Sequence, residues 1–404
     1  MWKTLRNLIA GGVASKILIG LANILIIKFL TKADYAAVSN FQFIQTLMSG
    51  LVFSPFLLSS VIGGNLFGMQ NMQRLFSALN LIQIILVLIC LTGALVYGEQ
   101  LAEDLFHKPL FYYPIIFGLV SSVFLTFQNI VLSGHQASGS FKSYNIVNIL
   151  RPVFLIALLA GFHFAGLLNF TTAASAFLLS YVFSVAGELP LILQATRIKG
   201  LFFRVKQFVW FWRTLKYLIL FFLVRATLDH IATFMVSRYF SVDDNAVYGV
   251  AFRYYAMADL IIYTAHVAFM NIFTLEPREE ARRKFSNWMK ITGLVSVVCL
   301  LILPFSGPLF SLVNGSQYDQ AFPVFVAFMA GITVYLCFSP VIYGIAERRS
   351  FKTLFILSLV ALVVQLLLTS LAAQMQNLVL MAVACVSARG IIYLSSLFLY
   401  FRKA

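Results

Sequence analysis

Long apolar runs recur along the whole chain, and they constrain its fold more than any other feature. A helix that crosses a bilayer needs about 20 apolar residues, and runs of this length alternate with short polar turns throughout the sequence. Of the 404 residues, 61% are hydrophobic and 11% are charged, whereas about a quarter of a soluble domain is charged. A soluble core cannot enclose so much apolar surface, but a bilayer can solvate it. The sequence therefore predicts an all-α integral membrane protein.

The apolar runs predict about twelve transmembrane helices joined by short loops. The longest connection divides the chain into an N-terminal lobe of six helices, 1–194, a basic and aromatic linker, 195–214, and a C-terminal lobe of six helices, 215–404. The linker composition suits a helix that lies in the membrane interface, and it equally suits a plain connection. The predicted spans are 7–31, 38–65, 76–98, 110–133, 141–161, 168–194, 215–238, 246–275, 291–313, 320–346, 353–373 and 378–401.

Lysine and arginine gather in one set of loops, which fixes the expected orientation. The linker alone holds Arg197, Lys199, Arg204, Lys206 and Arg213, whereas the opposite loops hold only Lys32 and Lys108. Because cytoplasmic loops carry the excess of Lys and Arg, we expect a multi-pass membrane protein with both termini cytoplasmic. The asymmetry also accounts for most of the net charge of +15, so the charge does not indicate nucleic-acid binding.

The two halves resemble each other at the end of their first helices. Residues 22–36 (ANILIIKFLTKADYA) align without a gap on 232–246 (ATFMVSRYFSVDDNA). The identical positions include Asp34, which pairs with Asp244, and Lys28 matches Arg238. Six helices in each half would give both halves the same orientation in the membrane. We therefore expect a structural repeat.

Charged residues inside the predicted spans are the best candidates for a functional site. Each costs about 2.5–3.5 kcal/mol at a helix centre on insertion scales, so such residues usually have a function. Lys28 and Arg238 lie in last turns and can reach the interface. The bases near mid-span, together with one base two turns into its span, are expected to bind substrate. These candidates are Lys16, Arg151, Arg225, Arg253 and Arg389.

The acidic and histidine residues of the spans are candidates for ion coupling. Asp229 lies four residues after Arg225 on the same helix face, so the two either neutralise each other or act in transport. Asp259 shares a face with His266, a spacing that suits either a proton relay or a simple hydrogen bond. Glu188 lies near a cytoplasmic end, where an interfacial role is equally suitable.

Signals for enzyme chemistry are missing from the sequence. It has no Walker A loop, no His or Cys cluster with metal-ligand spacing, and no outer loop long enough for a catalytic domain. The four cysteines lie inside apolar runs and are expected to be small buried hydrophobic residues. We expect a transporter with no catalytic residues, no metal and no cofactor.

Four segments resemble a known family and together cover most of the chain in order. They are KFLTKADYAAVSNFQ, LSGHQASGSFKSYNIVNILRPVFLIALL, DHIATFMVSRYFSVDDNAVYGVAFRYYAMADLI and VNGSQYDQAFPVFVAFMAGITVYLCFSPVIYGIAERRSFKT. In these segments the chain resembles Wzx-type polysaccharide flippases of the multidrug/oligosaccharidyl-lipid/polysaccharide exporter superfamily. The resemblance implies twelve helices in two lobes around a central cavity, as in the multidrug exporters of that superfamily.

The same resemblance implies a function and its partners. It implies movement of an undecaprenyl-pyrophosphate-linked oligosaccharide, such as an O-antigen repeat unit, from the cytoplasmic to the periplasmic leaflet, among membrane lipids and other membrane proteins of polysaccharide assembly. The buried charges fit, because bases outnumber acids and arginine pairs well with phosphate oxygens. The alternatives are a multidrug exporter of the same superfamily, a major-facilitator transporter, and a membrane-embedded glycan polymerase or ligase. Residues 63–75 lack the Gly-x-x-x-Asp-Arg pattern of the major facilitators, and a polymerase or ligase usually needs a large outer loop.

Overall fold

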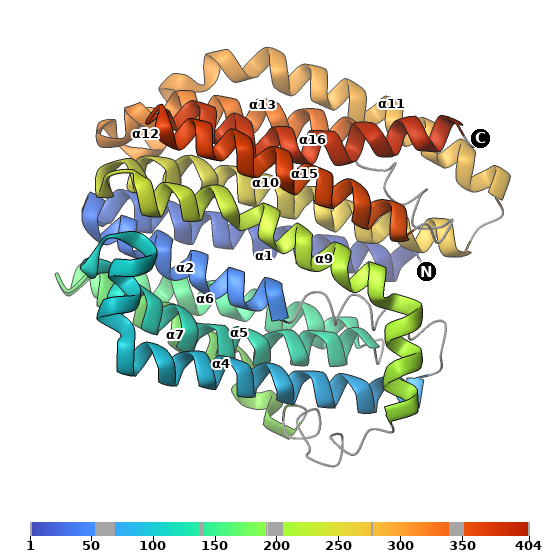
Figure 1. Ribbon diagram of the computed structural model, residues 1–404, viewed down its shortest axis with the longest axis horizontal. Helices are drawn as coiled ribbons and strands as arrows, with labels where there is room; N and C mark the ends of the chain where they lie inside the picture. Colours follow the sequence, from blue (N-terminus) through green and yellow to red (C-terminus); the bar gives the residue numbers. More distant parts are fainter. Residues whose placement is uncertain are drawn as a thin grey trace. The chain divides into compact units, whose positions relative to one another are not determined.

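The computed structural model describes residues 2–52, 69–137, 140–190, 192, 205–275, 278–338 and 351–402, and every regular element among them is helical (Figure 1). The α-helices are α1 (Trp2–Phe29), α2 (Lys32–Val52), α4 (Met69–Phe106), α5 (Tyr112–Ala137), α6 (Phe141–Phe164), α7 (Phe170–Val185), α9 (Val205–Tyr239), α10 (Val242–Leu275), α11 (Arg278–Ile302), α12 (Gly307–Asn314), α13 (Phe322–Phe338), α15 (Phe351–Gln374) and α16 (Leu378–Arg402). The 3₁₀ turns are η1 (Pro109–Phe111), η2 (Ala186–Glu188), η4 (Leu303–Ser306) and η5 (Ser316–Ala321).

The chain forms two compact units, which we name unit 1 and unit 2. Unit 1 contains Met1–Lys28 and Ile231–Ala404, and unit 2 contains Phe29–His230. This grouping differs from the predicted lobes in α1 and in the first part of α9, so the lobe boundaries stay a prediction. Residues 205–214 of the predicted linker are helical and open α9, and Figure 1 shows this beginning turned away from the direction of the rest of the helix.

Unit 2 is built on close packing between α2, α5, α6 and α7 (Figure 1). A Cβ atom at Gly118 of α5 would lie 2.8 Å from Cβ of Ile44 and 2.9 Å from the carbonyl oxygen of Phe41, so only glycine allows α2 to approach this closely. Polar side chains are buried along the same contact, where the Gln45 amide donates to the Ser121 hydroxyl. Bonds of this kind hold helices together in lipid, where apolar burial gives no driving force for helix association.

Unit 1 has an aromatic core between α10 and α13. Tyr248, Tyr255 and Phe328 are fully buried, and the ring centroids of Tyr255 and Phe328 lie 4.8 Å apart. On its other side α13 packs against α16, where a Cβ atom at Gly331 would lie 2.5 Å from Cβ of Val386. The helix α13 is therefore tightly packed against both α10 and α16, and the candidates Arg253, Asp259 and Arg389 lie on α10 and α16.

The structure confirms the repeat between the two halves. In the first half, Thr31 and Asp34 form a capping pair at the start of α2, in which the Thr31 hydroxyl donates to the Asp34 carboxylate at 2.8 Å. The matching Ser241 hydroxyl donates to Asp244 at 2.7 Å, and α10 begins there. The same spacing of 210 residues separates Gly166 and Gln376, both in the left-handed region with φ of 68° and 49°.

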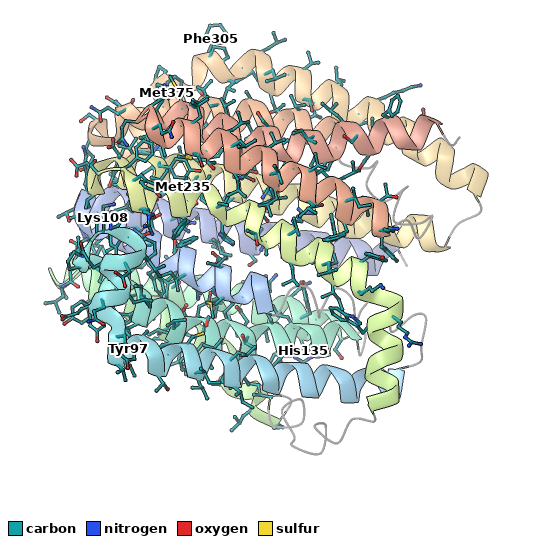
Figure 2. The ribbon with its side chains drawn as sticks, in the orientation of Figure 1. Tyr97, Lys108, His135, Met235, Phe305 and Met375 are labelled. Atoms are coloured by element: carbon teal, nitrogen blue, oxygen red, sulfur yellow. The ribbon has the colours of Figure 1, made fainter. Side chains whose placement is uncertain are left out.

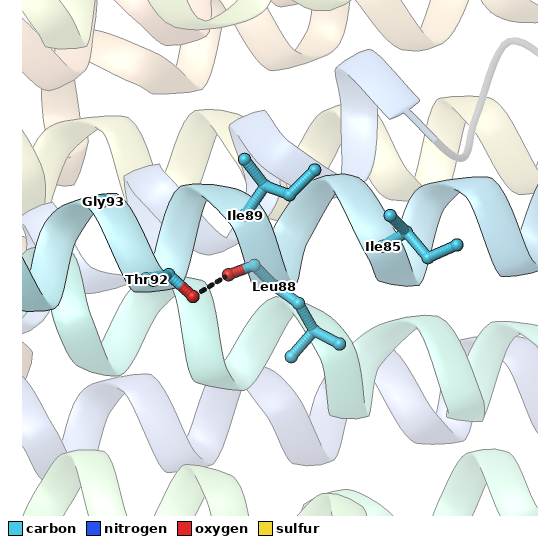
Figure 3. A pocket seen from close by; sticks show the side chains of 5 residues that line it. All are labelled: Ile85, Leu88, Ile89, Thr92 and Gly93. Atoms are coloured by element: carbon cyan, nitrogen blue, oxygen red, sulfur yellow. Dashed lines mark hydrogen bonds between the residues drawn. The ribbon is translucent and has the colours of Figure 1, made fainter.

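Two helices present most of their surface outward. The long apolar stretches Ile84–Phe106 of α4 and Met289–Asn314, which runs from α11 through η4 to the end of α12, are the least covered spans of the described chain. On α4, Ile85, Leu88 and Ile89 line a shallow apolar hollow in which the Thr92 hydroxyl donates back to the Leu88 carbonyl at 2.9 Å (Figure 3). Such faces suit contact with lipid, because a hydroxyl that faces lipid can form a hydrogen bond only with its own helix.

The fold class predicted from the sequence is confirmed. Nine stretches of the described residues are long and apolar enough to cross a membrane, and the architecture fits about twelve helices. Aromatic side chains such as Tyr97 and Phe305 are exposed within two of these stretches (Figure 2). The chain is a multi-pass membrane protein.

Candidate functional site

Arg389 and Asp259 form an ion pair inside unit 1. Arg389 lies on α16, about 16 Å from the helix start at 1.5 Å per residue, and Asp259 lies on α10. The Arg389 Nη1 atom is 2.8 Å from the Asp259 Oδ1 atom, and the two side chains are 8% and 23% exposed. Sequence analysis assigned Arg389 to the substrate and Asp259 to ion coupling, and the structure brings these two candidates together.

Tyrosine rings surround this ion pair. The guanidinium carbon of Arg389 lies 4.9 Å from the centroid of the Tyr255 ring, one helical turn before Asp259. On α13 the Tyr335 hydroxyl donates to the Val386 carbonyl, and its ring lies 5.3 Å from that of Tyr393. Arg389 thus has a carboxylate and an aromatic face beside it within its own unit, although the contact of its buried Nη1 atom with Asp259 is an ion pair without hydrogen-bond geometry.

Arg151 has a different environment in unit 2. It lies on α6, about 15 Å from the helix start, directly before Pro152, which lies inside the helix. Its guanidinium carbon is 4.0 Å from the centroid of the Tyr181 ring on α7. The Nε atom is buried without a hydrogen-bond partner, and the side chain as a whole is half-buried.

The energetic cost of a charge inside the membrane is therefore compensated differently at Arg151 and Arg389. A charge at a helix centre costs about 2.5–3.5 kcal/mol, and a desolvated cation–π contact returns about 2 kcal/mol. The stack on Tyr181 therefore leaves roughly 1 kcal/mol of the cost of Arg151 uncompensated, whereas Arg389 has an ion pair as well. Among the described residues, no carboxylate lies within ion-pair distance of Arg151.

The remaining predicted bases lie on three helices. Lys16 on α1 and Arg225 on α9 are half-buried, and each interacts with other groups. Asp229, one turn after Arg225, is also half-buried and has an interaction of its own. Arg253 on α10 is half-buried two turns before Asp259. The structure places Lys16, Arg253 and Arg389 in unit 1, and Arg151 and Arg225 in unit 2.

Glu188 pairs with a histidine that sequence analysis did not single out. The Glu188 Oε1 atom in η2 is 3.0 Å from the His135 Nε2 atom in the last turn of α5, a position marked in Figure 2. His266, the other member of the predicted relay, lies on α10, but its side chain falls outside the described side chains. The proton relay therefore stays a prediction.

The partners of the buried arginines are what sequence reasoning missed. Tyr181 follows Arg151 by 30 positions and lies on another helix, so no local spacing connects them. Tyr255 gave a usable signal, because it precedes Asp259 by four residues and shares its helix face. A tyrosine inside an apolar span also needs a partner for its hydroxyl when it is buried, which singles out both residues for attention.

Solved structures with the same fold are membrane transporters. The chain is similar to "Lipid II flippase MurJ, inward closed conformation", with a TM-score of 0.75 and 15% identity over 96% of this chain and 87% of that one. It is similar to an inward-facing multidrug resistance MATE family transporter of the MOP superfamily, with a TM-score of 0.70 and 14% identity over 96% and 94% of the two chains. A MOP superfamily transporter from Pyrococcus furiosus, described by a reverse polarity of its binding pocket, matches with a TM-score of 0.68 and 15% identity over 99% and 95%. No protein-family model and no curated protein sequence match the chain. At these identities the likeness establishes the fold.

Proposed function

We propose that the protein is a flippase that moves an undecaprenyl-pyrophosphate-linked oligosaccharide, an O-antigen or related repeat unit, from the cytoplasmic to the periplasmic leaflet of the bacterial inner membrane by alternating access. The observation that carries the proposal is Arg151, a half-buried guanidinium at mid-span with no described carboxylate beside it. A base left in this state suits a substrate that brings its own negative charge. The likeness in fold to a lipid II flippase supports a lipid-linked substrate.

The substrate-binding bases of this proposal are Lys16, Arg151, Arg225, Arg253 and Arg389. Unit 1 contributes Lys16, Arg253 and Arg389 to this set, and unit 2 contributes Arg151 and Arg225. Arg389 would bind the substrate only after it leaves Asp259, because one guanidinium cannot pair with two anions in good geometry at the same time. Asp229, Asp259, His266 and Glu188 remain the proposed ion-coupling groups, and Asp259 would release Arg389 when it takes up an ion.

An exporter of drugs or other small solutes is the alternative. The likeness to multidrug MATE structures favours it, and so does Asp259, which would be the acidic group for a cationic drug. The charge balance opposes it, because this carboxylate is already neutralised by Arg389. A glycan polymerase or ligase is the third candidate, and it would usually need a large outer loop, which the sequence does not offer.

Deletion of the gene tests the proposal against this alternative. We expect long surface glycan to vanish and the lipid-linked precursor to accumulate in the inner leaflet, and a plasmid copy of the gene to restore both. Unchanged surface glycan together with a lowered tolerance to cationic drugs would contradict the flippase and favour the exporter.

A further inference from the structure

The ring of Tyr181 is a fixed platform inside unit 2. Tyr181 is 1% exposed on α7, and its neighbours on the same helix face, Phe177 and Ser184, are buried as well. The ring centroids of Phe177 and of Phe41 on α2 lie 5.5 Å apart, and the Ser184 hydroxyl donates to the backbone carbonyl of Tyr181 at 2.8 Å. Because the Tyr181 ring is buried on all sides, it has little freedom to move, and it gives the guanidinium of Arg151 a fixed neighbour.

Among the described residues, no carboxylate lies within ion-pair distance of Arg151 beside this platform. The carboxylates of unit 2 whose partners are described are engaged elsewhere. Asp34 accepts from the backbone amide of Phe170 and from its own capping residue, and Glu188 pairs with His135. This is the opposite of Arg389, whose ring contact with Tyr255 is accompanied by Asp259. Within the part of the chain that the structure describes, each unit thus contains an Arg–Tyr contact, which is accompanied by a carboxylate in unit 1 and by none in unit 2.

We propose that Arg151 is the group that binds the diphosphate of the transported lipid and that Tyr181 is its positioning residue. This inference rests on the proposed function and assigns different roles to the bases of that site. The guanidinium carbon of Arg151 lies 4.0 Å from the ring centroid, and its buried Nε atom has no hydrogen-bond partner among the described residues, so the guanidinium keeps N–H donors that can pair with phosphate oxygens. A lysine at this position has no planar fork to lie on the ring, so it would bind the same anion with poorer geometry.

Binding of a short polyprenyl diphosphate to the purified full-length protein in nanodiscs tests this assignment. The probes are farnesyl diphosphate, farnesol and inorganic diphosphate, which separate the lipid-linked anion from the lipid alone and from the free anion. Arg151→Gln should weaken farnesyl diphosphate about tenfold or more, because it removes charge-assisted hydrogen bonds, and should leave farnesol unchanged. Tyr181→Phe keeps the ring and should bind within about threefold of the wild type, whereas Tyr181→Leu should lose about tenfold.

Two variants of the same unit serve as controls. Lys108→Gln removes another cation that lies over a ring, that of Phe111 at 5.6 Å, and Tyr35→Leu removes another fully buried tyrosine ring. Neither should change the affinity for farnesyl diphosphate. Unchanged binding in Arg151→Gln, or equal losses in Tyr181→Phe and Tyr181→Leu, would overturn the assignment while the proposed function stands. A wild-type protein that binds farnesol as tightly as farnesyl diphosphate would overturn both the assignment and the proposed function. A wild-type protein that prefers inorganic diphosphate would overturn the lipid-linked substrate in favour of a free anion.

Discussion

Removal of the Asp259 charge should destabilise the protein more than any other single change at the Arg389–Asp259 pair. Breaking a buried pair from one side costs about 3–5 kcal/mol, because it leaves the other charge buried and alone. Arg389 is 7% exposed, but the Asp259 side chain is 23% exposed, so water screens part of this cost. We expect Asp259→Asn to lower the free energy of unfolding by about 2–3 kcal/mol.

Removal of the Arg389 charge should lower the free energy of unfolding by less than removal of the Asp259 charge, and removal of both charges should lower it least. Arg389→Gln leaves Asp259 able to take up a proton and become neutral, whereas arginine stays charged in proteins. The double variant removes both charges, so we expect it to fall within about 1 kcal/mol of the wild type. The coupling energy between the two sites should then be about 2 kcal/mol.

Equilibrium unfolding in mixed micelles, followed by tryptophan fluorescence, measures these differences. Asp319→Asn is the matched control, because Asp319 belongs to the same unit, is exposed and accepts from the Ser311 hydroxyl at 2.6 Å. Its loss should cost less than about 1 kcal/mol. An Asp259→Asn variant within about 0.5 kcal/mol of the wild type, or single changes that simply add, would refute the view that this pair stabilises unit 1.

Three further changes test packing, backbone and topology. Gly118→Ala should destabilise the protein by about 2 kcal/mol, because its new Cβ overpacks the contact with α2, whereas Gly161→Ala, where a Cβ atom meets nothing within 4 Å, should be neutral in the same unfolding assay. Gln376→Ala should lower the free energy of unfolding by about 1 kcal/mol more than Gln376→Gly. Both variants lose the side-chain hydrogen bonds to the carbonyls of Tyr239 and Ala373, but only glycine relieves the left-handed backbone. Equal losses in the two variants would contradict this. Single cysteines at the exposed positions Glu103, Arg213 and Ser316 should react with an impermeant reagent in intact cells at the first and last only, and labelling at Arg213 would contradict the orientation.

The sequence predicted the fold well because its strongest signals are local. Apolar length identified the helices, and the match between 22–36 and 232–246 located the repeat that the Thr31–Asp34 and Ser241–Asp244 caps confirm. Helix ends were less certain, since α4 continues past its predicted end to Phe106 with a break at Tyr97. Polar residues extend such helices beyond the bilayer, and hydropathy does not register them.

The candidate site was only partly predictable. Arg151, Arg389 and Asp259 stood out because charge in a span is costly. Their environments could not be read from the sequence, since the partner of Arg389 lies 130 positions away on α10 and that of Arg151 lies on α7. Contacts between helices depend on how each helix is rotated about its own axis, and a run that is apolar all round carries little information about that rotation.

Transport by the purified protein in proteoliposomes tests the central claim most directly. The vesicles would carry a polyprenyl-diphosphate-linked oligosaccharide labelled on its sugar, and an impermeant sugar-binding lectin would report how much has reached the other leaflet. We expect the wild type to move the glycan many times faster than protein-free vesicles, Arg151→Gln to move it at least about tenfold more slowly, and Lys108→Gln to match the wild type. A wild-type protein that leaves the glycan in its original leaflet would contradict the account.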